Sequence, residues 1–314
     1  MTALLRTLLL WLSRQAALGN TLESIPFADR LIGRFVAGQT HEEAVEAARP
    51  LVQAGYRVTF SLLGEDVANE VAAAAASDAY RELLQQIASA GLASQSKIAV
   101  KPTLLGLGLS FETAQGNFNG ILEAARWVGV GVELDMEHSN TVDDTLALFR
   151  SGASETADLS IALQAYLRRT AADVDALITD GIARVRLVKG AYEESADDAY
   201  QTSEEVERAF HAIERTLLEP ESIAGGAWLA VATHDLRLIA GTRTRSHRKR
   251  TPDDRWEVQM LYGVRRKQQQ QLLAEGYPLR LYLPYGRHWY PYFMRRLAER
   301  PANLGFALRS LFCP

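Results

Sequence analysis

Residues 170–188 read TAADVDALITDGIARVRLV and contain one complete unit of the fold. Apolar side chains recur at helical spacing over residues 170–180, and the run ARVRLV at residues 183–188 has the length and composition of a short buried strand. The stretch therefore predicts a helix that is followed at once by a β-strand.

The same alternation of strand and helix continues in both directions along the chain. Eight short β-rich runs are expected, at residues 56–62, 97–101, 128–135, 159–164, 183–188, 228–233, 256–260 and 279–283. Helical patterns follow them at residues 66–90, 111–127, 141–150, 170–180, 203–218, 236–242, 264–275 and 290–299. Eight such units predict parallel strands that close into a (β/α)₈ or TIM barrel.

We expect one domain over residues 1–314, with an N-terminal helical region at 1–54 and the barrel at 55–314. In the helical region, Thr40 and Glu43 have the spacing of a capping box. The alternative is a doubly wound open sheet. Such a sheet usually carries a glycine-rich turn after its first strand, whereas this chain has LLGED at residues 62–66. The fold expected is therefore an α/β barrel.

Net charge, cysteine content and the N-terminal apolar run argue against a nucleic-acid-binding, a disulfide-rich and a membrane-spanning protein. The formal net charge is -4, so the charge of the whole chain does not indicate nucleic-acid binding. The single cysteine, Cys313, cannot form an internal disulfide or a cysteine-based metal site. Leu4, Leu8 and Leu12 lie on one side of an expected amphipathic helix that is too short to span a bilayer. We expect this helix to pack on its own domain, with weak peripheral membrane contact as the alternative.

Polar or ionisable groups stand at the end of every expected strand, which is where barrel enzymes carry their function. The most informative of them are Lys101, Asp135 and Arg186, because each interrupts an apolar run in which an unpaired charge would be costly to bury. Structural ion pairs within the barrel mouth are the alternative interpretation.

The expected final helix, YPYFMRRLAER at residues 290–300, follows the last strand. Tyr292, Arg295, Arg296 and Glu299 share one face of it at helical spacing. Two adjacent guanidinium groups there could bind a carboxylate or phosphate through bidentate hydrogen bonds. We expect this helix to lie across the barrel mouth as a cap, although a solvated charged face is also consistent with the spacing.

Two further features of the sequence, a pair of histidines and a basic stretch, do not add a catalytic or metal site to the prediction. His138 and His234 lack metal-ligand spacing, and no metal is expected. The stretch GTRTRSHRKRTPDDRW at residues 241–256 is strongly basic. We expect a solvated loop there, with a nucleic-acid patch or a membrane-facing role as alternatives.

Five strings together give the chain a family resemblance: ARVRLVKGAYEE (183–194), VATHD (231–235), EVQMLYG (257–263), RLYLPYG (280–286) and YFMRRLAE (292–299). From about residue 31 through 305, in family order, the chain resembles the proline dehydrogenases, and among them the monofunctional bacterial enzymes. This resemblance implies a distorted (β/α)₈ barrel with FAD as cofactor. It also implies oxidation of L-proline to Δ1-pyrroline-5-carboxylate, with hydride passing from proline C5 to flavin N5 and electrons to a quinone.

The resemblance also implies roles for individual residues. Asp135 and Arg186 are expected to form the active-site pair, and Glu65 to pair with Arg295 as a gate. The substrate is expected to contact Lys101, Arg295, Arg296, Tyr282, Tyr292 and Glu299. The expected FAD contacts are Met136, Gln164, Arg186, Lys189, Gly190, Ala191, Thr233, His234 and Gln259, and Tyr192 and Tyr262 are expected as further aromatic walls.

The resemblance implies a cytoplasmic enzyme, with the inner face of the membrane as an alternative location because the quinone acceptor lies in lipid. A separate pyrroline-5-carboxylate dehydrogenase would use the product, and no nucleic-acid partner is expected. Two other functions fit the residues alone: another barrel oxidoreductase or lyase that acts on a small carboxylate, and a basic-loop binding module without a cofactor.

Overall fold

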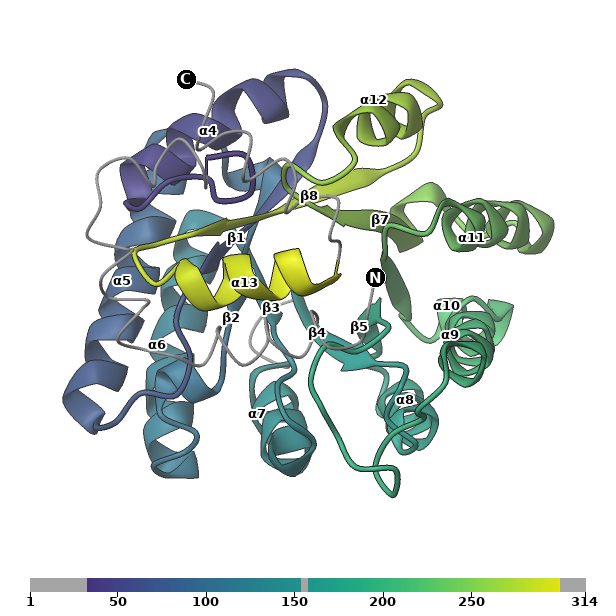
Figure 1. Cartoon of the computed structure of the whole chain (residues 1–314), viewed down its shortest axis with the longest axis horizontal. Helices are drawn as coiled ribbons and strands as arrows, with labels where there is room; N and C mark the ends of the chain where they lie inside the picture. Colours follow the sequence, from purple (N-terminus) through teal and green to yellow (C-terminus); the bar gives the residue numbers. More distant parts are fainter. Residues whose placement is uncertain (1–32, 154–157, 300–314) are drawn as a thin grey trace.

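Eight parallel strands close into a barrel in the order β1 to β8, as the computed structural model in Figure 1 shows. The structure describes residues 33–153 and 158–299. The strands are β1 Arg57–Leu62, β2 Ser96–Val100, β3 Gly131–Leu134, β4 Leu159–Gln164, β5 Arg184–Val188, β6 Trp228–Ala232, β7 Trp256–Leu261 and β8 Leu279–Tyr285. All eight strands predicted from the sequence are present, and the barrel is confirmed.

Helices α5 to α12 lie around the barrel and connect successive strands, whereas α4 precedes β1 and α13 follows β8 (Figure 1). They are α4 His41–Gln53, α5 Glu70–Ser89, α6 Phe111–Val128, α7 Val142–Ala153, α8 Thr170–Thr179, α9 Ser203–Leu217, α10 Pro220–Ala224, α11 Leu236–Lys249, α12 Arg266–Ala274 and α13 Tyr290–Glu299. The predicted amphipathic helix around Leu8 lies outside the described residues.

The apolar core lies between the strands and the ring of helices. Outward-facing strand residues such as Phe60, Ile98 and Leu281 are almost completely buried against helix residues such as Tyr80 and Phe118. Burial of side chains of this size stabilises the fold by roughly 1.5–3 kcal/mol each. Apolar packing between the strands and the surrounding helices therefore stabilises the barrel, and the barrel interior is available for polar groups.

The predicted capping box at the start of α4 forms only in part. The Thr40 side chain accepts a hydrogen bond from the Glu43 amide at 3.3 Å. The Glu43 carboxylate, however, accepts from the Gln39 amide at 2.6 Å instead of from Thr40. Gly38, with a φ of 124°, turns the chain so that the Gln39 amide faces this carboxylate.

The basic stretch at residues 241–256 is largely helical, so the predicted solvated loop is wrong for residues 241–249. Arg245 and Lys249 on α11 pair with Glu214 and Glu219 at 3.4 and 2.5 Å. Arg248 lies in the last turn of α11, where cations interact favourably with the helix dipole. These contacts extend the helix well past Thr242.

Helix α13 crosses the open end of the barrel, as the yellow helix in the foreground of Figure 1 shows. Tyr290, Tyr292 and Phe293 are buried on this helix. Their burial seats α13 over the carboxyl ends of the strands. The predicted capping position of the final helix is confirmed.

Candidate active site

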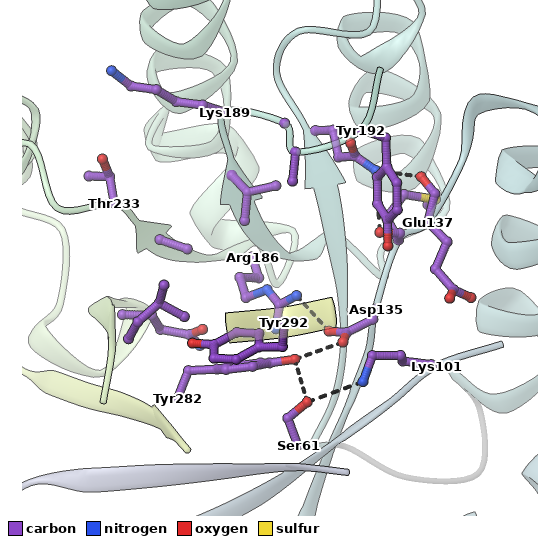
Figure 2. Close-up of a pocket in the computed structure, with 18 of the residues that line it drawn as sticks. Ser61, Lys101, Asp135, Glu137, Arg186, Lys189, Tyr192, Thr233, Tyr282 and Tyr292 are labelled. Carbon is purple, nitrogen blue, oxygen red and sulfur yellow. Dashed lines mark hydrogen bonds and ion pairs between the residues drawn. The ribbon is translucent and has the colours of Figure 1, made fainter. Parts of the chain in front are cut away.

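A pocket of about 430 Å³ opens at the carboxyl ends of the strands, beneath α13. Figure 2 shows the side chains that surround it. This volume lies in the range of ordinary small-molecule sites. The predicted site residues that line the pocket are Glu65, Lys101, Asp135, Met136, Gln164, Arg186, Lys189, Gly190, Ala191, Thr233, His234, Gln259, Tyr282 and Tyr292.

Three other predicted residues, Arg295, Arg296 and Glu299, lie on α13. Their side chains are outside the described part of the structure. Tyr192, predicted as an aromatic wall, also lines the pocket. Tyr262 is not among its lining residues, and Arg266 lies over its ring at 5.5 Å instead.

The pocket floor is built around an ion pair between two strands that are not neighbours. Arg186 of β5 donates to Asp135, just after β3, with Nη2 and Oδ1 2.6 Å apart. Both residues are buried. Burial alone would lower the pKa of Arg186, but the negative charges of Asp135 and Glu133 outweigh it and raise the pKa. Arg186 therefore stays charged.

Tyr282 of β8 connects this ion pair to strand β1. Its hydroxyl lies 2.8 Å from Asp135 Oδ2 and 2.8 Å from Ser61 Oγ (Figure 2). Because an ionised carboxylate only accepts hydrogen bonds and tyrosine carries one proton, Tyr282 donates to Asp135 and accepts from Ser61. The Arg186 guanidinium lies over the Tyr282 ring, 5.1 Å from its centre. Burial, together with the charge of Asp135, raises the pKa of Tyr282, so the hydroxyl stays protonated.

Lys101 extends the same network across the mouth. Its ammonium donates to the Leu62 carbonyl at 2.6 Å and to Ser61 Oγ at 3.4 Å. Both of these partners are neutral, so neither contact cancels the lysine charge. An ammonium placed in this way can attract an anion into the pocket.

Two glutamines on the opposite walls have their amide orientations fixed by the protein. Gln164 donates through Nε2 to the Met136 and Glu137 carbonyls, at 3.3 and 2.7 Å. Gln259 donates through Nε2 to Glu133 at 3.1 Å and to Glu257 at 3.0 Å. The Oε1 atoms of both glutamines are buried without a hydrogen-bond partner among the described residues. A ligand with N–H donors would satisfy these two acceptors.

On the β5 and β6 side, backbone and side-chain contacts shape the loops that follow the strands. The His234 Nε2 accepts from the Leu261 amide at 3.2 Å, which in the neutral ring puts the proton on Nδ1. Gly190 has a φ of 126°, and a Cβ there would lie 2.3 Å from the Tyr166 ring. Glycine is therefore required at this turn by both conformation and packing.

Glu137 is a buried carboxylate of the pocket wall that sequence reasoning assigned no role. It accepts hydrogen bonds from the Thr103 amide at 2.9 Å and from the Thr103 hydroxyl at 2.8 Å. Burial raises the pKa of Glu137 to about 7, despite the opposing effect of these hydrogen bonds. The contacts join the loops that follow β2 and β3.

Glu133 and Ser61 were also missed as members of the site. A signal for them exists in the period-two pattern, because residues 57, 59 and 61 in β1, and 133 and 135 near β3, are polar at alternate positions. That pattern marks the interior side of each strand. Within the described residues, no group of three or more His, Cys, Asp or Glu could hold a metal ion. None of the described helices is long and apolar enough to cross a membrane.

The fold and this pocket define a (β/α)₈-barrel enzyme with cations and carboxylates gathered at the ends of its strands. The family model for proline dehydrogenase matches residues 44–309. The chain therefore belongs to the proline dehydrogenase family of oxidoreductases.

Curated relatives agree with this assignment over nearly the full length. The chain is 37% identical to Proline dehydrogenase 1 of Bacillus subtilis over 309 residues, which cover 98% of this chain and 99% of that protein. It is 35% identical to the proline dehydrogenase of Deinococcus radiodurans, with 90% of each chain covered.

The chain is also similar to part of a larger protein of known structure. It matches proline utilization A (PutA) from Bdellovibrio bacteriovorus, inactivated by N-propargylglycine, with a TM-score of 0.80 and 25% identity. The match covers 90% of this chain and 34% of that one. The chain thus spans about a third of the length of that protein.

Proposed function

We propose that the chain is an FAD-dependent proline dehydrogenase that oxidises L-proline to Δ1-pyrroline-5-carboxylate, the first step of proline catabolism to glutamate. The observation that carries the proposal is the convergence of Lys101, Asp135 and Arg186 on one pocket beneath α13. Family membership supports the same reaction. Proline is a small substrate with a carboxylate, a ring amine and apolar methylenes, and the pocket offers cations for the carboxylate and apolar side chains such as Leu63 and Met260 for the methylenes.

Recognition of the carboxylate would fall to cations at the rim. Lys101 is held by the neutral oxygen atoms of Ser61 and Leu62, and its ammonium would attract an anion. Arg295 and Arg296, on the helix that crosses the mouth, would add two guanidinium groups. Guanidinium groups suit bidentate binding of a carboxylate and would fix the ring in one orientation.

The residues of the β4 to β7 side fit a flavin. The buried Oε1 atoms of Gln164 and Gln259 are acceptors, and the buried Nε of Arg186 is a donor, all without a hydrogen-bond partner among the described residues. The edge of a flavin ring offers both acceptors and N–H donors. The residues that would hold FAD are Met136, Gln164, Arg186, Lys189, Gly190, Ala191, Thr233, His234 and Gln259. When bound, FAD would supply the two-electron acceptor for the hydride that leaves C5 of proline.

The ring amine must be neutral when the hydride leaves, because a C=N bond forms with the nitrogen lone pair. Asp135 is a poor acceptor for the amine proton, since its two oxygens already accept from Arg186 and Tyr282. We infer that the proton passes to solvent before the site closes. Asp135 then serves to orient Arg186 and Tyr282 on the pocket floor.

Glu65 and α13 would form a gate over the site. Glu65 follows β1, and β1 pairs with β8 in the closed barrel. Arg295 lies on the helix just after β8. We propose that the two residues pair when substrate is bound, and that the helix excludes water from the closed site. An ion pair at the rim contributes about 0–1 kcal/mol, which lets the gate reopen for product release.

The electron acceptor, the fate of the product and the location of the enzyme follow from the same chemistry. Electrons would leave the reduced flavin for a quinone, and a separate pyrroline-5-carboxylate dehydrogenase would use the product. We propose a cytoplasmic location, with weak contact at the inner face of the membrane where quinone is available.

The test is a visible spectrum of the purified protein before and after anaerobic addition of L-proline. We expect flavin absorbance that L-proline bleaches and that an equal concentration of glycine leaves unchanged. A colourless protein that also fails to take up added FAD would contradict the proposal.

A further inference from the structure

The interior of the barrel beneath the pocket carries charged side chains where barrels of this class usually pack Val, Ile and Leu. Glu133 on β3 is completely buried there. It lies two residues before Asp135 on the same inward side of the strand. Its contacts cross the barrel to β5 and β7, which are not neighbours of β3.

Glu133 lies within ion-pair distance of the second amino group of Arg186, without a hydrogen bond to it. Its Oε2 lies 3.5 Å from Arg186 Nη1, while Asp135 binds Arg186 Nη2 at 2.6 Å. The guanidinium is therefore placed between two carboxylates. Gln259 fixes Glu133 in turn, because its Nε2 lies 3.1 and 3.2 Å from the two carboxylate oxygens.

The polar layer continues below this point with a second carboxylate, which Gln259 Nε2 also reaches, at 3.0 Å. Glu257 on β7 is also completely buried. It accepts from Arg280 Nε at 2.6 Å and from Arg57 Nη1 at 3.2 Å. Glu257 is thus paired with two arginines of its own, whereas Glu133 is paired with Arg186 and its charge also acts on the buried Lys97.

We propose that Glu133 is a positioning residue that acts through Arg186 and sets the reduction potential of the bound flavin. The inference rests on the proposed function, because it requires FAD beside Arg186. A positive charge beside the flavin stabilises the electron-rich reduced form. Glu133 is a second negative charge on the same guanidinium, and it weakens that stabilisation. It thereby keeps the potential lower than Arg186 and Asp135 alone would set it.

The test measures the midpoint potential of the flavin in the FAD-loaded protein by reductive titration against a reference dye. In the Glu133→Gln variant the side chain keeps its shape and one acceptor for Gln259 but loses its charge. We expect the midpoint potential to rise, with FAD still bound and with Arg186 still paired with Asp135. Circular dichroism and thermal unfolding of the same samples establish that each variant is folded.

Two more variants separate this role from a structural one. Glu257→Gln removes a carboxylate buried to the same degree but away from Arg186, so we expect it to reduce stability and leave the potential close to wild type. Glu133→Asp moves the carboxylate away from Arg186 by the length of one methylene and should therefore give a smaller rise in midpoint potential. This rise can still be measured if Glu133→Gln does not fold.

An unchanged potential in the folded Glu133 variants would overturn the inference, and so would an equal rise in Glu257→Gln. Failure of the proposed function has a different signature, because wild-type protein would then bind no FAD or would not be bleached by L-proline.

Discussion

Tyr282 lies within β8 and Asp135 just after β3, two strands that are not neighbours in the barrel, yet their oxygen atoms are 2.8 Å apart. The contact makes the pocket floor one connected network from Lys101 through Ser61 and Tyr282 to Asp135 and Arg186. A network of this kind responds as a unit when one member is removed.

We predict that Ser61→Ala and Tyr282→Phe are strongly coupled in their effect on stability. Tyr282→Phe removes a hydrogen bond to a charged group and should cost roughly 1.5–3 kcal/mol. Ser61→Ala should cost less, on the order of 1 kcal/mol. The double variant should lose about 0.5–1.5 kcal/mol less than the sum, because each hydroxyl depends on the other. Urea unfolding of the four proteins measures this difference.

A matched control uses Tyr262→Phe, since Tyr262 is a half-buried tyrosine that does not line the pocket. Its effect should add to that of Ser61→Ala. Simple additivity for Ser61 and Tyr282 as well would show that the network is not coupled.

We predict that Arg295→Met and Arg296→Met weaken proline binding while FAD stays bound. Loss of a charged hydrogen-bonded partner should cost roughly 2–5 kcal/mol in kcat/KM. Steady-state kinetics give the KM for proline, and the flavin absorbance of the desalted protein gives the bound FAD. Arg287→Met is the control, because Arg287 is an exposed cation just before α13. A KM that stays at the wild-type value in both variants would refute the carboxylate role.

We predict that α13 is better protected from solvent when the site is occupied. A carboxylate ligand should draw Arg295 and Arg296 inward and hold α13 more firmly against the barrel mouth. Hydrogen exchange over residues 290–299, with and without a non-oxidisable proline analogue, measures the change. Helix α11 is the internal control because its paired cations lie away from the pocket. Equal exchange of residues 290–299 in both states would mean that α13 is a fixed wall.

We predict that Glu137 makes stability depend on pH below neutrality. Its pKa is raised from 4.5 to about 7 in the folded protein. The folded state therefore keeps a proton that the unfolded chain has released. The resulting stability is fully present below pH 4.5 and is lost as pH rises through about 7.

The Glu137→Gln variant removes this dependence. Its stability relative to wild type should thus increase between about pH 5 and about pH 8, by on the order of 3 kcal/mol. Unfolding curves at the two pH values test this, and Glu123→Gln, an exposed carboxylate on α6, serves as the control. A pH-independent difference would show that Glu137 does not titrate in this range.

The barrel could be predicted from the sequence because eight short strands alternate with helices, a pattern that few other folds share. The start of β3 shows where such patterns mislead. The run VGVGVELD at residues 128–135 suggested one strand, but α6 continues to Val128 and ends at Gly129, which has a φ of 72°. A glycine helix cap followed by a strand reads like one long strand in sequence.

The site was predicted less completely than the fold. Lys101, Asp135 and Arg186 were found because each is a charge in an apolar run. The role of Glu133 depends on Arg186 and Gln259, whose strands lie across the barrel. Register and closure decide those contacts, and single-strand patterns do not contain them. The basic stretch was predicted wrongly because its partners are distant in sequence: Glu214 lies on α9, and Glu219 lies just before α10.

The seam between β1 and β8 has a consequence for biosynthesis. Val58 pairs with Leu281, and the Ala37 amide donates to the Pro284 carbonyl at 2.7 Å, so the seam joins the first strand of the barrel to the last one. Until β8 leaves the ribosome, β1 and β7 each present an unpaired edge to other nascent chains. Contacts this distant in sequence form slowly. The ribosome-bound chain is therefore most prone to aggregate just before its last strand is complete.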